Sequence, residues 1–198
     1  MYKYFSTLLI FIFSMISVFS FTMDTGLSLS DASFFGESAG DSSSSSVSGV
    51  GDVNGDGFDD FIIGAPINAQ NDPNGGQTYL ILGRSSGWSM DTNLSLSNAS
   101  FIGENLGDYS GGSVSGVGDV NGDGFDDFII GAYGDEDGGG AYAGQTYLIL
   151  GRSSGWSMDT DLSLSNASFI GEATFDSSGD SVSGVGDVNG DGFDDFII

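Results

Sequence analysis

Short apolar runs bounded by glycine and serine recur along the chain, and none has the spacing of an amphipathic helix. FDDFIIGA (58–65) and QTYLILG (77–83) are apolar on both faces, which is typical of strands packed between layers. SVSGVGD (46–52) is short and β-branched, and NLSLSNASF (93–101) alternates like a strand with one solvated face. The pattern predicts an all-β chain of short strands joined by turns.

These segments recur in register. MDTGLSLSDASFFGE from Met23 returns, slightly changed, from Met90 and Met158, and GQTYLILGRSSGWS from Gly76 returns from Gly144. The chain therefore divides into units at about 23–89, 90–157 and 158–198, the last truncated. About four strands per unit is the content of one antiparallel β-propeller blade. Because propellers have about four to eight blades, we expect an incomplete propeller or a fragment of a larger one, and closure would need further blades or other chains.

Residues 1–20 differ from the rest of the chain. Lys3 precedes an apolar run without acids, and the small residues Val18 and Ser20 suit a cleavage site after Ser20. This predicts a signal peptide, leaving 21–198 as the propeller region of a secreted or cell-surface protein. An uncleaved membrane anchor is the alternative, because the run is marginally long enough to span a bilayer.

Acidic residues outnumber basic ones 28 to 3, and the formal net charge is −25. This balance argues against nucleic acid or an anionic membrane surface as partner. The chain has neither cysteine nor histidine, which excludes disulfides, Cys/His zinc sites and Ser-His or Cys-His dyads. We do not expect an enzyme.

The acids concentrate in DVNGDGFDD, which begins at Asp52, Asp119 and Asp187. In each copy, side-chain oxygens at positions 1, 3, 5 and 9 and the carbonyl of position 7 can converge on one hard cation, and calcium takes about six to eight such oxygens. We expect one Ca²⁺ per unit, three in all. The candidate ligands are Asp52, Asn54, Asp56, Phe58, Asp60, Asp119, Asn121, Asp123, Phe125, Asp127, Asp187, Asn189, Asp191, Phe193 and Asp195.

The spacing differs from that of an EF-hand, because Ile63 takes the place of the glutamate at position 12 and a strand follows instead of a helix. The alternative is a metal-free β-turn, since Asn-Gly and Asp-Gly are hairpin signals. Three crowded carboxylates would then repel one another. The aspartates at position 8 (Asp59, Asp126 and Asp194) are expected to point away from the ion, into solvent.

FFG at 34–36, followed by DVNGDGFDD and by GAP at 64–66, resembles the FG-GAP repeat. That repeat forms the blades of the integrin alpha-chain β-propeller and of many secreted bacterial proteins, and the resemblance covers 23–198. It implies four-stranded blades with a calcium loop between the first and second strands. The sequence departs from the pattern at Ile102-Gly103, Ile170-Gly171 and Tyr133.

These features predict a calcium-binding module for adhesion or protein contact, with structural calcium and an extracellular protein or glycan as ligand. The loops after FIIGA and before SVSG differ between units, and recognition would differ there. The alternatives are a lectin-like propeller that stacks sugars on Trp88 and Trp156, and a purely structural repeat of a larger exported protein. Asn93, Asn98 and Asn166 head glycosylation sequons, which matter if the source is eukaryotic.

Overall fold

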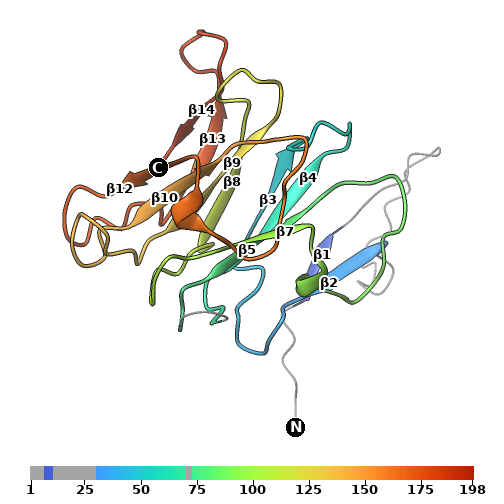
Figure 1. The fold of residues 1–198 in the computed structure, drawn as a ribbon, viewed down its shortest axis with the longest axis horizontal. Coiled ribbons are helices and arrows are strands. Elements are labelled where there is room, and N and C mark those ends of the chain that lie inside the picture. Colours follow the sequence, from blue (N-terminus) through green and yellow to red (C-terminus); the bar gives the residue numbers. More distant parts are fainter. Residues whose placement is uncertain (1–6, 11–29, 70–72) are drawn as a thin grey trace, which may run out of the picture.

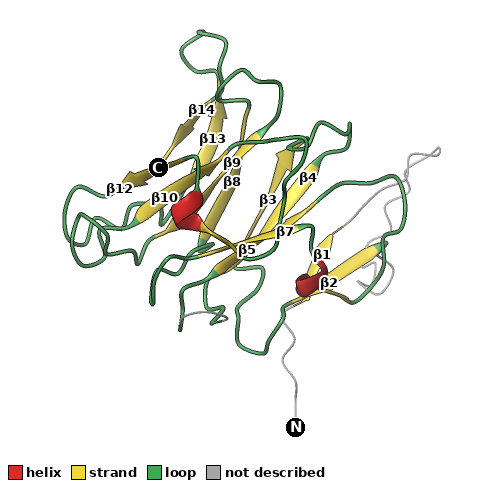
Figure 2. Ribbon diagram, viewed as in Figure 1, coloured by secondary structure: helices red, strands yellow, loops and turns green. Residues whose placement is uncertain are grey.

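A computed structural model describes residues 7–10, 30–69 and 73–198, and they form an almost entirely β structure of fanned sheets (Figures 1 and 2). The first full blade has the strand order β7-β5-β4-β3, all antiparallel. Its strands are β3 (Ser46–Gly51), β4 (Asp60–Ala65), β5 (Gln77–Ile81) and β7 (Ala99–Ile102). The prediction of four-stranded antiparallel propeller blades is confirmed.

The second blade repeats the first in the order β12-β10-β9-β8. It consists of β8 (Ser113–Gly118), β9 (Asp127–Ala132), β10 (Gln145–Ile149) and β12 (Ala167–Ile170). Even the irregularities recur, because the register shifts once in the innermost strand pair of each blade, between Gly49 and Gly51 and between Gly116 and Gly118. The innermost strands β3, β8 and β13 lie next to one another, so the blades fan out from a common line (Figure 1).

Parts of two more blades flank these sheets. β13 (Ser183–Gly186) and β14 (Asp195–Ile197) correspond to the two inner strands of a third blade. At the other end, β1 (Thr7–Ile10) pairs with β2 (Ala32–Phe35) in the register that β5 and β7 share. β1 falls inside the predicted signal segment; the rest of that segment lies outside the described residues, and the signal prediction stays a prediction.

Two short strands, β6 (Thr92–Asn93) and β11 (Thr160–Asp161), pair in parallel with β2 and β7 and lead into single 3-10 turns. The turns are η2 (Leu94–Leu96) and η3 (Leu162–Leu164). The expectation of a continuous strand over NLSLSNASF is therefore wrong in its first half. Asn93 caps η2 by accepting from the Ser95 amide at 2.8 Å, and the turn buries Leu94 while Leu96 stays 75% exposed.

The blades are out of phase with the units of the sequence. Ala99–Ile102 belongs to the second unit, yet it pairs with β5 and completes the first blade. In the same way, β12 from the third unit completes the second blade. Each unit therefore begins with the outermost strand of the blade before it. The expectation that one sequence unit forms one whole blade is corrected accordingly.

The apolar middle strands are buried on both faces, as their sequence predicts. In β4, Ile62 packs in a core with Phe128 and Ile130 of the next blade, whereas Ile63 packs in another core with Phe34 of β2. Both isoleucines are fully buried. The hydrophobic contact between successive blades therefore supplies most of the core, as expected when each repeat covers its neighbour. In the part of the chain that the structure describes, no helix is long and apolar enough to cross a membrane.

Candidate metal centre

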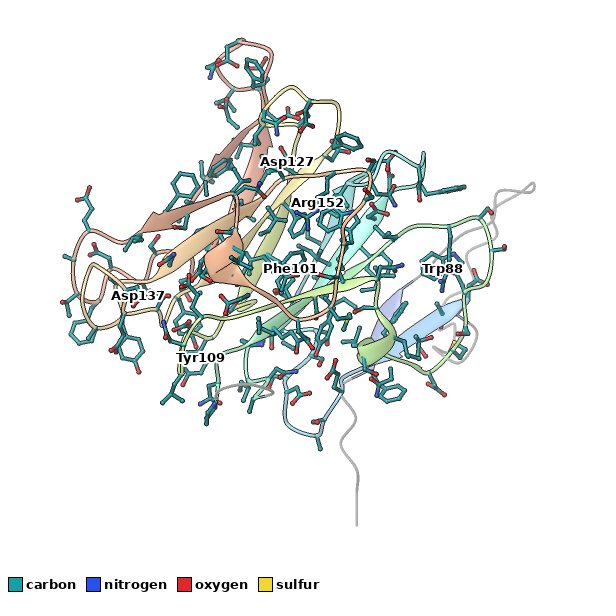
Figure 3. All side chains as sticks on the ribbon, in the orientation of Figure 1. Trp88, Phe101, Tyr109, Asp127, Asp137 and Arg152 are labelled. Atoms are coloured by element: carbon teal, nitrogen blue, oxygen red, sulfur yellow. The ribbon has the colours of Figure 1, made fainter. Side chains whose placement is uncertain are left out.

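The three DVNGDGFDD loops join β3 to β4, β8 to β9 and β13 to β14, and they lie on the same rim of the fan (Figure 1). Each loop therefore connects the first and second strands of its blade, as the resemblance implies. Asp127, at position 9 of the second loop, marks this rim in Figure 3.

The aspartate at position 1 organises its loop. Oδ1 of Asp52 accepts from the amides of Gly55 (2.7 Å) and Asp56 (3.0 Å), and Oδ2 accepts from the amide of Gly57 (2.7 Å). The turn needs positive φ at Gly55 (74°) and Gly57 (89°), a conformation that glycine adopts without steric cost. Asp119 and Asp187 make the same three bonds in their loops.

Positions 3, 5 and 7 lie at the surface of the loop. Oδ1 of Asn54 accepts from the Asp56 amide at 2.8 Å, and its Nδ2 donates to Oδ2 of Asp56 at 2.9 Å. Oδ1 of Asp56 accepts from the Phe58 amide at 3.0 Å. These side chains are held on one short turn, and all the side-chain atoms that they could offer to a cation are oxygens.

The aspartate at position 9 is buried at the base of the loop. In Asp60, which is 2% exposed, Oδ2 accepts from the Val53 amide (3.0 Å) and Oδ1 from the Gly83 amide (2.6 Å). Burial raises its pKa to about 6, and the charges of Asp56 and Asp52 add to the rise. Asp127 has the same two kinds of bond and the same raised pKa, about 6, from burial. In the third loop, Oδ2 of Asp195 accepts from the Val188 amide in the same way, whereas its Oδ1 accepts from Nδ2 of Asn189 at 3.4 Å.

The donor set fits a hard divalent cation in its chemistry. The candidate ligands of each loop are three of its four carboxylates, one amide oxygen and a backbone carbonyl, and oxygen donors of this kind are what calcium takes. The carboxylates are not gathered as they stand: within residues 30–69 and 73–198, no three acidic side chains form a group that could hold a metal ion. They serve the loop's own amides instead, so ion binding would have to draw on their remaining lone pairs.

The aspartates at position 8 do not all point into solvent, which corrects the sequence-based expectation. Oδ2 of Asp126 accepts from the amide of Asp52 in the preceding loop at 2.8 Å, and Oδ2 of Asp194 accepts likewise from Asp119 at 3.1 Å. Only Asp59 is exposed, because the described chain has no loop before its own. The sequence does hold one signal of this contact between loops, namely the glycine that precedes position 1 in every copy. A Cβ at Gly51 would lie 2.0 Å from Oδ2 of Asp126, so the aspartate can approach only a glycine there.

Trp88 and Trp156, the candidate sugar platforms, pack between successive blades: Trp88 contacts Phe34 of β2 and Phe61 of β4. The guanidinium of Arg84 lies 4.6 Å from the ring centre of Trp88, and that of Arg152 lies 4.4 Å from Trp156. Trp156 also packs against Phe101 and Phe128, with ring centroids 6.4 and 6.3 Å away. Both rings are occupied by an arginine and by phenylalanines of two successive blades, so the geometry does not favour the lectin-like alternative.

The sequon asparagines lie near the outer strands. Oδ1 of Asn98 accepts from the Leu82 amide and Oδ1 of Asn166 from the Leu150 amide, both at 2.9 Å, and both residues are exposed. Asn93 caps η2 and is half-buried. Glycosylation of the three stays a prediction.

The opposite rim carries the loops that differ between units, and Tyr109 and Asp137 mark it in Figure 3. Tyr109 stacks on Tyr133 with ring centroids 5.1 Å apart, and Tyr142 stacks on Phe175 at 6.1 Å. Tyr109, Tyr142 and Phe175 adopt positive φ (53°, 53° and 68°), which is uncommon for bulky residues. Phe175 is nevertheless 72% exposed. Strained, exposed aromatic side chains of this kind favour a contact surface.

Comparison with known proteins agrees with this geometry. The family model described as FG-GAP repeat matches residues 44–81 and 110–149, which hold the three inner strands of the two full blades. The chain is 30% identical over 172 residues to integrin alpha-IIb of Mus musculus, covering 84% of this chain and 15% of the relative. It is 33% identical over 153 residues to integrin alpha-V of Gallus gallus (75% and 13%) and 29% identical over 148 residues to integrin alpha-4 of Xenopus laevis (74% and 13%).

The chain thus spans about one seventh of the length of these curated relatives. The similarity extends beyond the loops, because the aligned stretches cover three quarters or more of the chain in the two relatives with the highest identity. The strand order, the position of the loops and the two matched segments lead to one conclusion: the chain contains integrin alpha-like FG-GAP repeats that fold as β-propeller blades.

Proposed function

We propose that this chain is a calcium-binding β-propeller module of a secreted or cell-surface protein, and that it acts in adhesion or protein contact. The observation that carries the proposal is the repeated loop. Asp52, Asp56 and Asp60 share one turn; burial raises the pKa of Asp60, and the charges of Asp56 and Asp52 add to the rise. In the described residues, the guanidinium groups of Arg84 and Arg152 stack on tryptophan rings. A divalent cation would relieve this repulsion.

Calcium is structural in this proposal. The first ion would be held by Asp52, Asn54, Asp56, the carbonyl of Phe58 and Asp60, and the other two by the matching residues. Because position 9 also fixes the start of β4 or β9, an ion there would tie the loop to the sheet. Its bond to the connection that follows β5 or β10, at Gly83 or Gly151, would carry the effect across the blade.

Isothermal titration with calcium tests this proposal. We expect about three ions per chain and a rise in melting temperature with calcium concentration, because an ion that binds only the folded state stabilises it. Asp56→Ala should lose one ion. Asp59→Ala is the matched control, since it removes the same charge from the same loop without removing a candidate ligand. Three ions bound by Asp56→Ala, or none bound by the native chain, would refute the calcium site.

The contact surface in this proposal is the opposite rim, with Tyr142 and Phe175 at its exposed edge. A panel of immobilised extracellular matrix proteins and a glycan array are the probes. Protein hits that Phe175→Ser weakens support adhesion through this rim, and Leu164→Glu, an exposed change elsewhere, serves as control. Glycan hits that Trp156→Phe weakens would instead favour the lectin-like function.

A further inference from the structure

The two full blades differ at one buried position of the opposite rim, which holds Asn68 in the first blade and Asp135 in the second. The surrounding backbone is the same in both. The Asn68 amide donates to the Ala65 carbonyl at 3.0 Å, and the Asp135 amide donates to the Ala132 carbonyl at 3.1 Å. Asn68 is 4% exposed and Asp135 is fully buried. The second blade therefore places a carboxyl group where the first blade has an amide.

In the first blade, the side-chain hydrogen bonds around this position run in one direction. Nδ2 of Asn68 donates to the Tyr79 hydroxyl at 2.9 Å, and that hydroxyl donates to Oε1 of Gln77 at 3.1 Å. All three side chains are buried. Because the amide supplies a donor, the hydroxyl can use its single proton on the glutamine, and Oε1 of Gln77 has a partner.

The second blade keeps the tyrosine and the glutamine but reverses the first of these bonds. An ionised Asp135 can only accept, so the Tyr147 hydroxyl donates to its Oδ2, at 3.2 Å. The hydroxyl then has no proton left for Gln145. Oε1 of Gln145 has no hydrogen-bond partner among the described residues, although the residue is only 5% exposed. A buried acceptor without a donor is destabilising.

The groups that face Asp135 and Tyr147 are acidic, and they come from the neighbouring connections as well as from the loop itself. Burial raises the pKa of Asp135 above its ordinary value of 3.8, and the charge of Asp137 adds to the rise. Glu104 also hydrogen-bonds the Tyr147 hydroxyl, so two carboxylates compete for one hydroxyl proton. The titratable groups around the pair are Glu104, Asp108, Glu136 and Asp137, with Asp161 of β11 beside Glu104.

We propose that Asp135 is a buried proton site, and that its proton does in the second blade what the side-chain amide of Asn68 does in the first. In mild acid, protonated Oδ2 donates to the Tyr147 hydroxyl, which then donates to Oε1 of Gln145. Loss of the proton reverses the first bond and leaves Oε1 without a donor. The opposite rim of the second blade is therefore more stable in mild acid than at neutral pH, and the same position of the first blade does not respond to pH.

The direction of the pH dependence follows from proton linkage. A carboxyl group whose pKa is raised by folding binds more protons in the folded chain than in the unfolded chain. Its contribution to stability is complete below the ordinary value of 3.8 and is lost as pH rises through the pKa of folded Asp135. Because an asparagine does not titrate, Asp135→Asn should keep its stability over that range while the native chain loses part of its own.

Melting temperatures recorded against pH in chelator, with a reciprocal pair of variants, test the proposal. Asp135→Asn should melt close to the native chain in acid and several degrees above it at neutral pH. Asn68→Asp gives the first blade a second proton site and should lose stability more steeply than the native chain as pH rises. Glu136→Gln is the control, since it removes one charge from the adjacent exposed position and should keep the native slope. Asp108 is present in all four chains, so its titration cancels from the comparison.

Three outcomes would overturn the proposal. Asp135→Asn could melt below the native chain at neutral pH, which would mean that the ionised carboxylate is the stabilising form. It could instead keep the full native slope, or Asn68→Asp could leave that slope unchanged. Because calcium is absent throughout, none of these results depends on whether the loops of the other rim bind an ion.

Infrared spectroscopy locates the proton without relying on stability. At a mildly acidic pH, where an ordinary aspartate is ionised, the native spectrum minus that of Asp135→Asn should contain the carbonyl band of a protonated carboxyl group. Glu104→Gln should keep this band, since it removes only the competing carboxylate. A difference spectrum without the band, or a band that Glu104→Gln removes, would show that Asp135 does not hold the proton.

Discussion

Asp126 offers a sharp test of how the blades are held together. Its Oδ2 accepts from the Asp52 amide at 2.8 Å, so Asp126→Ala leaves that amide without its acceptor. A hydrogen bond to a charged group contributes about 1.5–3 kcal/mol, and an unsatisfied buried donor costs about 1–3 kcal/mol. Both residues are only half-buried, so water compensates part of the loss. We expect the free energy of unfolding to fall by about 1–2 kcal/mol.

Urea denaturation followed by circular dichroism measures this loss at dilute, fixed protein concentration. Asp59→Ala is the matched control, since it removes the same residue from the same loop position, where no loop among the described residues receives it. It should change stability by less than about 0.5 kcal/mol. Asp194→Ala should behave like Asp126→Ala, because Asp194 accepts from the Asp119 amide at 3.1 Å. Equal effects for Asp59→Ala and Asp126→Ala would refute the inter-blade role, since the aspartate would then act through its own loop or through net charge.

Three further predictions follow from other parts of the molecule. Burial raises the pKa of Asp108 from 3.8 to about 7, with Asp135 and Asp137 adding to the rise, so its contribution to stability falls as pH increases from about 4 to about 7. Asp108→Asn should flatten that part of a melting-temperature profile recorded in chelator, and an unchanged slope would contradict the assignment. Trp156→Ala removes the contacts with Phe101, Phe128 and Arg152 and should cost about 2–4 kcal/mol in urea denaturation, well beyond the effect of the exposed control Leu164→Ala. Gly55→Ala places a Cβ 2.7 Å from the Phe125 ring at a φ of 74° and should destabilise the chain by more than about 1 kcal/mol, whereas Gly190→Ala, strained alike but open, should cost less.

The strands of each blade could be predicted from the sequence because their patterns have a single interpretation. Runs such as FIIGA, apolar on both faces, can only be buried on both faces, and the structure buries Ile62 and Ile63 in two different cores. The alternating pattern gave a wrong prediction at Leu94 and Leu96, where a strand was expected and the structure has a 3-10 turn. Alternation looks the same in a strand and in a short turn with one inward side chain, and the cap from Asn93 decided for the turn.

Contacts between units were harder to foresee. A one-dimensional sequence shows that Gly51 and Asp126 recur, but it does not say that they meet across 75 residues of chain. The sequence does not show which blade each outer strand joins, for the same reason. Only the pairing of Gln77 with Ile102 assigns β7 to the first blade. The loop ligands stay at the level of a prediction, because the spacing gives the donor types and the structure shows their carboxylates bound to backbone amides.

Each unit contributes the outer strand of the blade before it, so neighbouring units are interlocked through a shared sheet. A unit that melts takes β7 or β12 away from the blade before it and exposes the apolar edge of β5 or β10. Local opening is therefore penalised twice, once in the unit that opens and once in the intact blade upstream. Such a chain should unfold as one cooperative body rather than blade by blade, and proteases that cut between units should find few places where a single cut frees a complete blade.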